Sequence, residues 1–280
     1  MRVLYVSQYF VNADQAGGVR HYQHTRALAR AGHHVSVVTT YVTHKERTVP
    51  EEYRGHKVVR ETDADGIEVW RTYSTPGYGR DLRSRVASYG TFAWWSAVAG
   101  ARAARPDVVV ASSPSLPSAA AAAVLAKARR APFLLEVRDL WPDSAIEMGL
   151  VKDAKTIAVA RRMERFCYGA ADRIVALTEG IRDGMIAQGV PPGKIELITN
   201  GVDLEIGADP VPADAPVPDG AVVAMYVGAH GTYSSLDTLL DAAEHLRDAP
   251  DVRIVLVGSG DQKDGLVLDE VVKLALLNSP

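Results

Sequence analysis

Val3-Leu4-Tyr5-Val6 and Val35-Ser36-Val37-Val38-Thr39 are two short runs rich in β-branched residues, and the segment between them, residues 19–31, has apolar side chains at helical spacing. Short apolar runs of this kind are typical of strands that are buried on both faces of a sheet. A helix that connects two such strands is the βαβ unit of a parallel sheet. These forty residues therefore predict an α/β fold with a mainly parallel sheet.

The same alternation of strand and helix continues along the chain. Further strands are expected at residues 108–111, 133–137, 174–176 and 196–198, and further helices at residues 115–129, 155–168 and 179–188. The polar segment 44–72 interrupts this rhythm. Within it, residues 58–60 and 67–71 flank Asp63-Ala64-Asp65-Gly66, which predicts a small strand pair or an excursion at the edge of the sheet.

A proline-rich stretch divides the chain into two parts. Residues 207–220 contain four prolines and have no periodicity, which is the composition of a linker. The pattern then restarts with an expected strand at 222–227, a helix at 236–246 and a strand at 253–257. We therefore expect two Rossmann-like lobes, an N-terminal lobe of residues 1–205 and a partial C-terminal lobe of residues 221–280, joined by a linker of residues 206–220. The final apolar run, 266–277, is predicted to be one helix.

Composition limits the classes of function. The net charge of −3 gives no overall basic field of the kind that binds nucleic acid. The single cysteine, Cys167, excludes an intrachain disulfide, favours a reducing cytoplasmic location and is expected to be core filler rather than a nucleophile. The apolar start of the chain is too short for a signal peptide, and the alanine-rich stretch 118–126 is too short to span a bilayer. A soluble or peripheral protein is expected.

Glycine-bearing loops follow three of the predicted strands. They contain Gly17-Gly18-Val19, Gly228-Ala229-His230-Gly231 and Gly258-Ser259-Gly260-Asp261. Glycine lets backbone N–H groups approach a ligand closely, and the helix N-termini that follow favour phosphate. A glycine pair alone is equally typical of a tight turn, but three such loops at the carboxyl ends of strands predict a ligand cleft. The dinucleotide fingerprint GxGxxG is absent, which argues against a nucleotide-dependent dehydrogenase.

Two of these loops, Gly17-Gly18-Val19 and Gly258-Ser259-Gly260-Asp261, carry a family resemblance. Two further motifs share it, Glu136-Val137-Arg138-Asp139-Leu140-Trp141-Pro142 and Asn200-Gly201-Val202-Asp203, and Ser112-Ser113-Pro114 matches as well. On these residues the chain, from Met1 to about Gly265, resembles family 4 of the retaining glycosyltransferases, in the branch that builds bacterial surface polysaccharides. The resemblance implies a GT-B fold. It also implies sugar transfer from a UDP-, GDP- or dTDP-linked donor to a glycan or polyprenyl-linked acceptor, without an obligatory metal or cofactor.

The resemblance assigns roles in the first lobe. Gly17 and Gly18 would present backbone donors to the donor phosphates. Arg138 stands where many members have His; it would reach the transferred sugar or the acceptor, and it can bind phosphate bidentately. Asp139 would orient Arg138 or bind a sugar hydroxyl, the alternative being a structural Arg–Asp pair.

Two further residues are assigned to the acceptor or sugar pocket. They are Ser113 and Trp141, and for Trp141 a place in the core is the alternative. No pair of carboxylates for a covalent intermediate stands out, so we expect a front-face displacement.

The second lobe departs from the family pattern. The residues expected to bind the donor phosphates there are Gly228, His230, Gly231, Gly260 and Lys263. No Lys or Arg lies between residues 225 and 247, where many members have a basic clamp, so backbone amides would bind more of the anion. Members also continue through an acidic pair that binds the nucleotide ribose and sugar. We therefore expect a truncated lobe whose nucleotide site lacks one wall.

A basic and aromatic insertion occupies residues 78–105. The side chains expected to contact a membrane are Arg80, Arg83, Arg85, Trp94 and Trp95. A helix with this composition docks on anionic headgroups at the inner face of the membrane, where a polyprenyl-linked acceptor would be found. The alternative is a core-packed helix with solvated arginines.

Two other functions compete with glycosyl transfer. One is a non-hydrolysing sugar-nucleotide epimerase, for which converging acidic and basic residues cannot be identified in the sequence. The other is a non-catalytic glycosyltransferase remnant that binds a partner or a glycan, which a shortened second lobe would favour.

Overall fold

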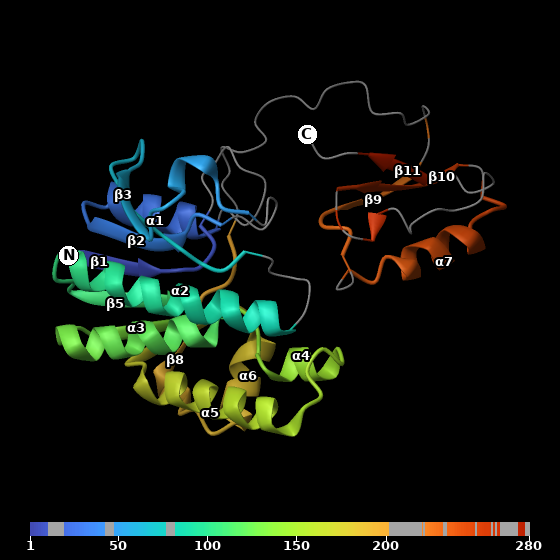
Figure 1. Ribbon diagram of the computed structural model, residues 1–280. Helices are drawn as coiled ribbons and strands as arrows, with labels where there is room; N and C mark the ends of the chain where they lie inside the picture. The colour runs from blue at the N-terminus through green and yellow to red at the C-terminus, as the bar shows by residue number, and fades with distance from the viewer. Residues whose placement is uncertain are drawn as a thin grey trace. The chain divides into compact units, whose positions relative to one another are not determined.

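The computed structural model describes residues 1–10, 20–42, 48–76, 82–201, 220, 222–231, 234–249, 251–258, 260, 262–263 and 274–277. The chain divides into two compact units, Met1–Asp203 and Leu204–Pro280. Each is an α/β unit built on a sheet whose strands are parallel or mainly parallel (Figure 1). Each unit is described by itself.

The first unit is built on an eight-stranded sheet with the order β3-β4-β2-β1-β5-β6-β7-β8. Its strands are β1 (Arg2–Val6), β2 (His34–Thr40), β3 (Val58–Thr62), β4 (Glu68–Thr72), β5 (Val108–Ser112), β6 (Phe133–Val137), β7 (Arg173–Ala176) and β8 (Ile195–Leu197). All neighbouring strands are parallel except β3 and β4, which pair antiparallel at the edge. The parallel sheet and the small strand pair at its edge are confirmed.

Four helices of this unit lie close to the predicted positions, a fifth occupies the insertion at residues 78–105, and the short helix at residues 143–147 was not predicted. The helices are α1 (Arg20–Arg30), α2 (Leu82–Arg102), α3 (Leu116–Arg129), α4 (Asp143–Glu147), α5 (Ala154–Ala170) and α6 (Glu179–Ala187), with short 3-10 turns η1 (Glu51–Tyr53) and η2 (Pro192–Lys194). Two have side-chain N-caps: Asp153 accepts from Thr156 N at 2.8 Å, and Thr178 accepts from Ile181 N at 3.1 Å. Such caps satisfy N–H groups that have no partner within the helix, and they fix where α5 and α6 begin.

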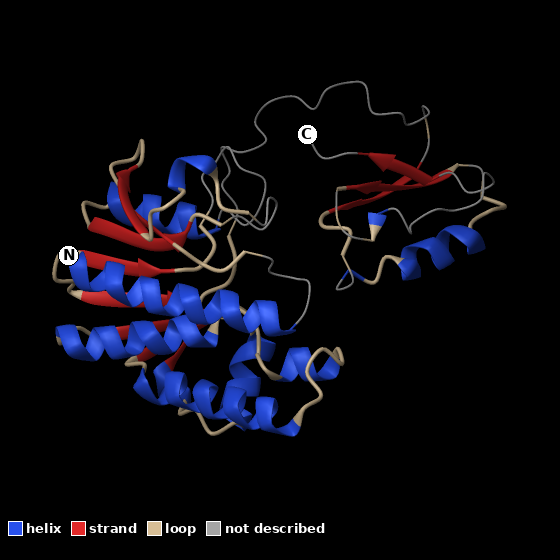
Figure 2. Cartoon of the chain, in the orientation of Figure 1, coloured by secondary structure: helices blue, strands red, loops and turns tan. Residues whose placement is uncertain are grey.

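Helices cover both faces of the sheet, which explains why the strands are apolar on both sides (Figure 2). On β1, Leu4 and Val6 belong to the core that includes Phe92 of α2 and residues of α3, α5 and α6. Tyr5 points to the opposite face, where it packs in a second core with Val37 and side chains of α1. None of the helices in the described part of the chain is long and apolar enough to cross a membrane.

Cys167 of α5 lies in the larger core and is fully buried. Burial raises the pKa of its thiol to about 12, so the reactive thiolate is absent at neutral pH. The prediction that this cysteine fills the core is confirmed.

The second unit contains a three-stranded parallel sheet with the order β11-β10-β9. Its elements are β9 (Val222–Val227), α7 (Asp237–His245), β10 (Val252–Val257) and β11 (Leu274–Leu277). Leu236 and Ala243 pack against Ile254 and Leu256 of β10 to form a small core.

The predicted helix at residues 266–277 is wrong where the structure describes it. Residues 274–277 form β11, which pairs with β10 from Ile254↔Leu274 to Val257↔Leu277; residues 264–273 lie outside the described residues. A short apolar run fits a buried helix and a buried strand equally well. Here the free edge of β10 provides backbone hydrogen bonds, and this tertiary pairing decides in favour of the strand.

Candidate functional site

A cluster of buried and partly buried polar side chains lies at the carboxyl edge of the first sheet, which we define as the edge where its parallel strands end. The cluster is formed by Ser7 after β1, Ser112 at the end of β5, Glu136 near the end of β6, and Arg20 and His21 at the start of α1. In open α/β sheets, ligands bind at this edge. The position therefore singles out these side chains as a candidate site.

Glu136 is the centre of the cluster and is 4% exposed. Its Oε1 accepts two hydrogen bonds from Arg20, at 3.0 Å from Nε and 2.7 Å from Nη2. Its Oε2 lies 3.3 Å from His21 Nε2 and 3.4 Å from the Tyr5 hydroxyl, which donates to it. Because a buried carboxylate is costly unless it is paired, this set of donors is what allows Glu136 to stand inside an apolar strand.

His21 connects the first helix to three strand ends. Its Nδ1 lies 3.1 Å from Ser7 Oγ and 3.3 Å from the Tyr9 carbonyl oxygen, and its Nε2 lies 3.2 Å from Ser112 Oγ. The ring is almost completely buried and lies 5.5 Å from the Tyr5 ring. These contacts hold the N-terminal turn of α1 against the edge of the sheet.

The environment keeps Glu136 ionised. Burial alone would raise the pKa of its carboxyl, but the hydrogen bond and charge of His21, with further hydrogen bonds from Ser112 and Arg20, hold the pKa far below its usual range. Burial and the neighbouring Glu136 charge raise the pKa of Tyr5, so Tyr5 remains a neutral hydrogen-bond donor.

Arg138 adds a second guanidinium to this edge. Its backbone N–H donates to Ser113 Oγ at 3.1 Å, and its Nε donates to the Ser113 carbonyl oxygen at 2.8 Å. Burial lowers its pKa, and the charge of Glu136 opposes that shift; an arginine still stays protonated at neutral pH. With Arg20, Arg138 and one carboxylate, the cluster carries excess positive charge. Arg20 Nη1 is buried and has no hydrogen-bond partner among the described residues.

The structure brings two of the predicted first-lobe residues together, because Arg138 contacts the buried Ser113 directly. Asp139 is placed differently: its Oδ2 accepts from Ser144 Oγ at 2.9 Å, at the start of α4. Trp141 is partly buried and packs against the larger core. Gly17 and Gly18 lie outside the described residues.

Sequence reasoning gave no role to Arg20, His21 or Glu136. One signal was available for Glu136, because it interrupts the apolar run Phe133-Leu134-Leu135-Glu136-Val137. A carboxylate in a strand that is buried on both faces requires a cationic partner. The identity of that partner, 116 positions away along the chain, follows from the fold alone.

The corresponding edge of the second unit holds His230, which is fully buried. Neither ring nitrogen has a hydrogen-bond partner among the described residues. Burial, and next the nearby charge of Lys263, lower the pKa of His230, which favours its neutral form. The Lys263 ammonium donates to the Gly258 carbonyl oxygen at 3.2 Å.

The two loops of this edge are pressed together. Gln262 N donates to the His230 carbonyl oxygen at 3.0 Å, and Gly228 N donates to the Val257 carbonyl oxygen at 2.9 Å. A Cβ at Gly260 would overlap the His230 carbonyl oxygen. Glycine at position 260 is therefore required by this close approach of two backbones. Gly231, the remaining predicted residue, accepts from Ser234 N at 2.9 Å through its carbonyl oxygen.

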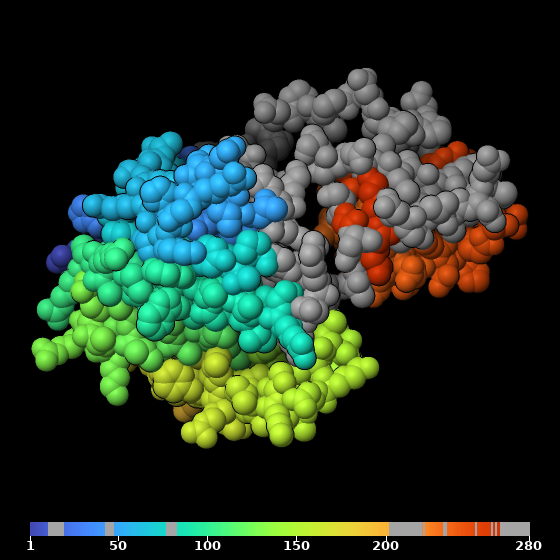
Figure 3. All heavy atoms as spheres, viewed as in Figure 1, coloured from blue at the N-terminus to red at the C-terminus, as the bar shows by residue number. Residues whose placement is uncertain are grey.

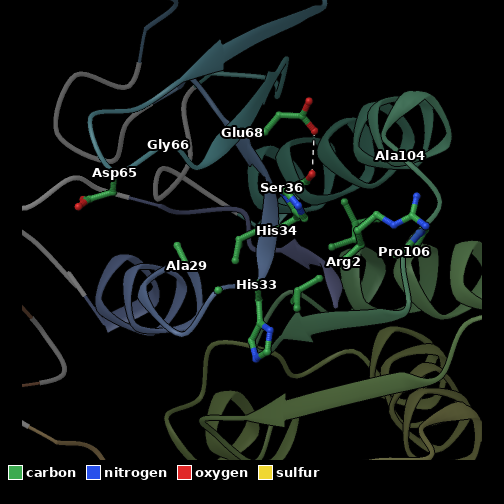
Figure 4. A pocket seen from close by; sticks show the side chains of 14 residues that line it. Arg2, Ala29, His33, His34, Ser36, Asp65, Gly66, Glu68, Ala104 and Pro106 are labelled. Carbon is green, nitrogen blue, oxygen red and sulfur yellow. Dashed lines mark hydrogen bonds between the residues drawn. The ribbon is translucent and has the colours of Figure 1, made fainter.

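A hollow of about 530 Å³ lies at the opposite edge of the first sheet, at the amino ends of β1 and β2 (Figure 4). Arg2, His33, His34 and Glu68 line it, and Ser36 Oγ donates to Glu68 Oε2 at 2.7 Å. Ligands of open α/β sheets bind at the carboxyl ends of the strands, so this hollow is not the candidate site. Among the described residues, no group of three or more His, Cys, Asp or Glu side chains is arranged to hold a metal ion.

Comparison with known proteins agrees with this geometry. The model of the glycosyl transferase 4-like domain matches residues 17–201, which include Arg20, His21, Ser112, Glu136 and Arg138 but not Ser7. The chain belongs to the glycosyl transferase 4-like domain family. The family resemblance and the GT-B fold expected from the sequence are confirmed.

Individual relatives are more distant. The chain is 25% identical over 248 residues to the putative colanic acid biosynthesis glycosyl transferase WcaI of Escherichia coli K12; the match covers 84% of this chain and 60% of WcaI. Among solved structures, it resembles Anabaena Alr3699/HepE in complex with UDP-glucose, with a TM-score of 0.62 at 15% identity over 100% of this chain and 69% of that one. The UDP-GlcNAc 2-epimerase of Neisseria meningitidis aligns with a TM-score of 0.55 at 13% identity, covering 100% of this chain and 73% of that one. At such identities these structures show the shared fold.

Proposed function

We propose that the chain is the donor- and acceptor-binding part of a glycosyltransferase that uses a nucleotide-diphosphate sugar. The observation that carries this proposal is the buried cluster of Arg20, His21, Glu136 and Arg138 at the carboxyl edge of the first sheet, in a chain of the glycosyl transferase 4-like family. The chain spans 60% of the length of WcaI, so the activity proposed is that of the whole protein.

The cluster suits a diphosphate for a physical reason. Glu136 balances the charge of Arg20 but leaves its Nη1 donor without a partner among the described residues, and Arg138 adds a second cation. Charge-assisted hydrogen bonds from guanidinium groups to phosphate oxygens are strong and directional. Fixed donors of this kind stabilise the charge that develops on a departing nucleotide diphosphate.

We assign the transferred sugar and its acceptor to the first unit, beside Arg138 and Ser113, and the nucleotide to the second unit, beside His230 and Lys263. HepE was solved with UDP-glucose, which makes a UDP-sugar the first donor to test. WcaI is a colanic acid biosynthesis glycosyltransferase by its name, which supports a glycan or polyprenyl-linked acceptor.

For the reaction we propose retention of anomeric configuration by front-face displacement. A covalent route would need a carboxylate nucleophile free to reach the anomeric carbon. Both oxygens of Glu136 are occupied by Arg20, His21 and Tyr5, and Asp139 Oδ2 is bonded to Ser144. Mass spectrometry of the enzyme quenched during turnover should find no glycosyl adduct, and an adduct would overturn this mechanism.

The function is tested by calorimetric titration of the chain with UDP-, GDP- and dTDP-sugars. We expect one of them to bind, and Arg138→Ala to weaken that binding by roughly tenfold or more, the loss expected for one charge-assisted hydrogen bond. Arg129→Ala is the matched control, because Arg129 also donates to backbone carbonyls, at Ala101 and Ala103, but lies on α3. Absence of binding by all three donors would favour the non-catalytic remnant.

A further inference from the structure

The helices α2, α3 and α5 have an unusual charge balance. Together they carry nine Lys or Arg residues and one acidic residue, Glu164. Glu164 is buried and accepts from the Tyr168 hydroxyl at 3.0 Å, so it presents no charge to solvent. Six of the basic residues are exposed: Arg83, Arg102, Lys127, Lys155, Arg162 and Arg165. The outer side of these helices is strongly cationic, although the whole chain has a net charge of −3.

The same three helices also expose large apolar side chains. They are Val86 at 57%, Trp94 at 67%, Val124 at 59%, Val159 at 61% and Phe166 at 47% exposure. By contrast, the described residues of α1, β3 and β4 expose no large hydrophobic side chain. Of the predicted aromatic pair, Trp94 points outward while Trp95 is half-buried. Arg80 lies outside the described residues.

These side chains share one surface. α3 packs against both α2 and α5, and the three helices lie side by side on one face of the sheet, so their outer sides form a continuous layer (Figure 1; teal through yellow in Figure 3). A hollow of about 760 Å³ between α3 and α5 opens within it, lined by Val124, Lys127, Arg165 and Phe166 among others. We call this layer the α2–α3–α5 face.

We propose that the α2–α3–α5 face docks on a bilayer surface that contains anionic phospholipid. Lys and Arg side chains bind phosphate headgroups, while Trp, Phe and Val enter the boundary between headgroups and acyl chains. The pattern of exposed side chains favours a membrane surface over a protein partner. The core of a protein–protein interface is depleted of charge, whereas here each of the three helices exposes at least one cation and at least one large apolar side chain. A second copy would place six exposed cations against six, which is repulsive.

Docking through this face is a property of the first unit and does not depend on the proposed sugar transfer. It can therefore be measured without donor or acceptor. The test is co-sedimentation of the full chain with vesicles of phosphatidylcholine, with and without phosphatidylglycerol. We expect binding to the anionic vesicles alone, and its loss at high salt because counterions screen the attraction between exposed cations and headgroups.

The face is mapped by two matched double variants. Lys127→Gln with Arg165→Gln removes two cations from the face, and Arg30→Gln with Arg54→Gln removes two exposed cations elsewhere. Each cation near an anionic surface contributes roughly fivefold to partitioning, so we expect about a 30-fold fall for the first pair and a much smaller change for the second. All four side chains are solvent-facing, and unchanged circular dichroism and melting temperature verify the fold.

Trp94→Ala tests the apolar contribution, and we expect it to lower partitioning into the anionic vesicles by several-fold. Equal binding to neutral vesicles, no binding to either kind, or an equal effect of the two double variants would each overturn the proposal. The chain could also self-associate without lipid. If Trp94→Ala or the Lys127/Arg165 double variant abolished that self-association, the proposal would be overturned, because a second copy would then cover the face.

Discussion

Both units have buried polar side chains at the carboxyl edges of their sheets, but the two edges differ in whether these side chains have hydrogen-bond partners. In the first unit, Glu136 is buried with partners on both oxygens. In the second, His230 is buried with no hydrogen-bond partner for either ring nitrogen among the described residues. In both units a strand is followed by a loop and a helix, so this arrangement does not determine whether the polar side chains at a sheet edge have hydrogen-bond partners within the unit. The identity of one or two side chains determines it.

The units also differ in charge. Residues 1–203 contain 27 basic and 21 acidic residues, a net charge of +6, whereas residues 204–280 contain 4 basic and 13 acidic residues, a net charge of −9. The net charge of −3 conceals this division. Excess positive charge in the first unit accords with the cationic cluster at its sheet edge and with the α2–α3–α5 face. The second unit has few cations with which to bind an anionic ligand.

The largest expected effect on stability comes from removing the ion pair between Glu136 and Arg20 at the carboxyl edge of the first sheet. Glu136→Gln leaves Arg20 partly buried without a counter-charge, and removal of one partner of a buried ion pair costs roughly 3 kcal/mol. Urea unfolding should therefore show a loss of about this size. Glu61→Gln is the control, because its ion pair with Arg71 at 2.7 Å is more exposed and should contribute less than about 1 kcal/mol. Equal losses in the two variants would contradict the larger contribution of the buried ion pair.

The same pair predicts a dependence on pH. Because the folded protein holds the pKa of Glu136 below its unfolded value of about 4.3, the stabilisation is complete above that value and is lost as the pH falls toward the folded pKa. Wild type should lose free energy of unfolding more steeply than Glu136→Gln between about pH 5 and pH 3. Parallel curves would mean that Glu136 titrates normally.

A smaller effect is expected from the close approach of the two loops in the second unit. Gly260→Ala places a Cβ on the His230 carbonyl oxygen and should destabilise the second unit by about 1–3 kcal/mol, the usual cost of overpacking. Gly90→Ala is the matched control, since a Cβ at this exposed position of α2 meets nothing within 4 Å. There alanine should stabilise by about 0.5–1 kcal/mol, because it favours helix more than glycine does. If thermal melts showed that both variants change the melting temperature in the same direction, the close approach of the two backbones would not be the reason for glycine at position 260.

The smallest effect on stability is expected at the unpaired edge. His230→Leu removes a buried polar group that has no partner among the described residues, so the free energy of unfolding should stay within about 1 kcal/mol of wild type or rise. Affinity for the nucleotide-sugar that binds wild type should fall roughly tenfold, because the imidazole is then missing from the site. Calorimetry and urea unfolding on one preparation measure both. A large loss of stability with unchanged affinity would show that His230 is structural.

Much of the fold could be predicted because its signals are local. Strands such as Val108–Ser112 and helices such as Leu116–Arg129 were predicted within one or two residues, since β-branched runs and helical periodicity are properties of neighbouring residues. Arg138 and Ser113 were predicted as site residues from a motif, and the structure places them in contact; their roles in binding stay predictions. Gly17, Gly18 and Arg80 were predicted as well, and they lie outside the described residues.

By itself the sequence determined the alternation of strands and helices and the family resemblance of the chain, and the proline-rich linker stays a prediction. The tertiary structure alone decided that Leu274–Leu277 is a strand, that Arg20 and His21 meet Glu136, and that the exposed cations of three helices share one face. The reason is physical. Periodicity is set by the geometry of adjacent residues, whereas strand pairing, burial of charge and a common surface depend on segments that are distant in the chain and meet when the sheet assembles.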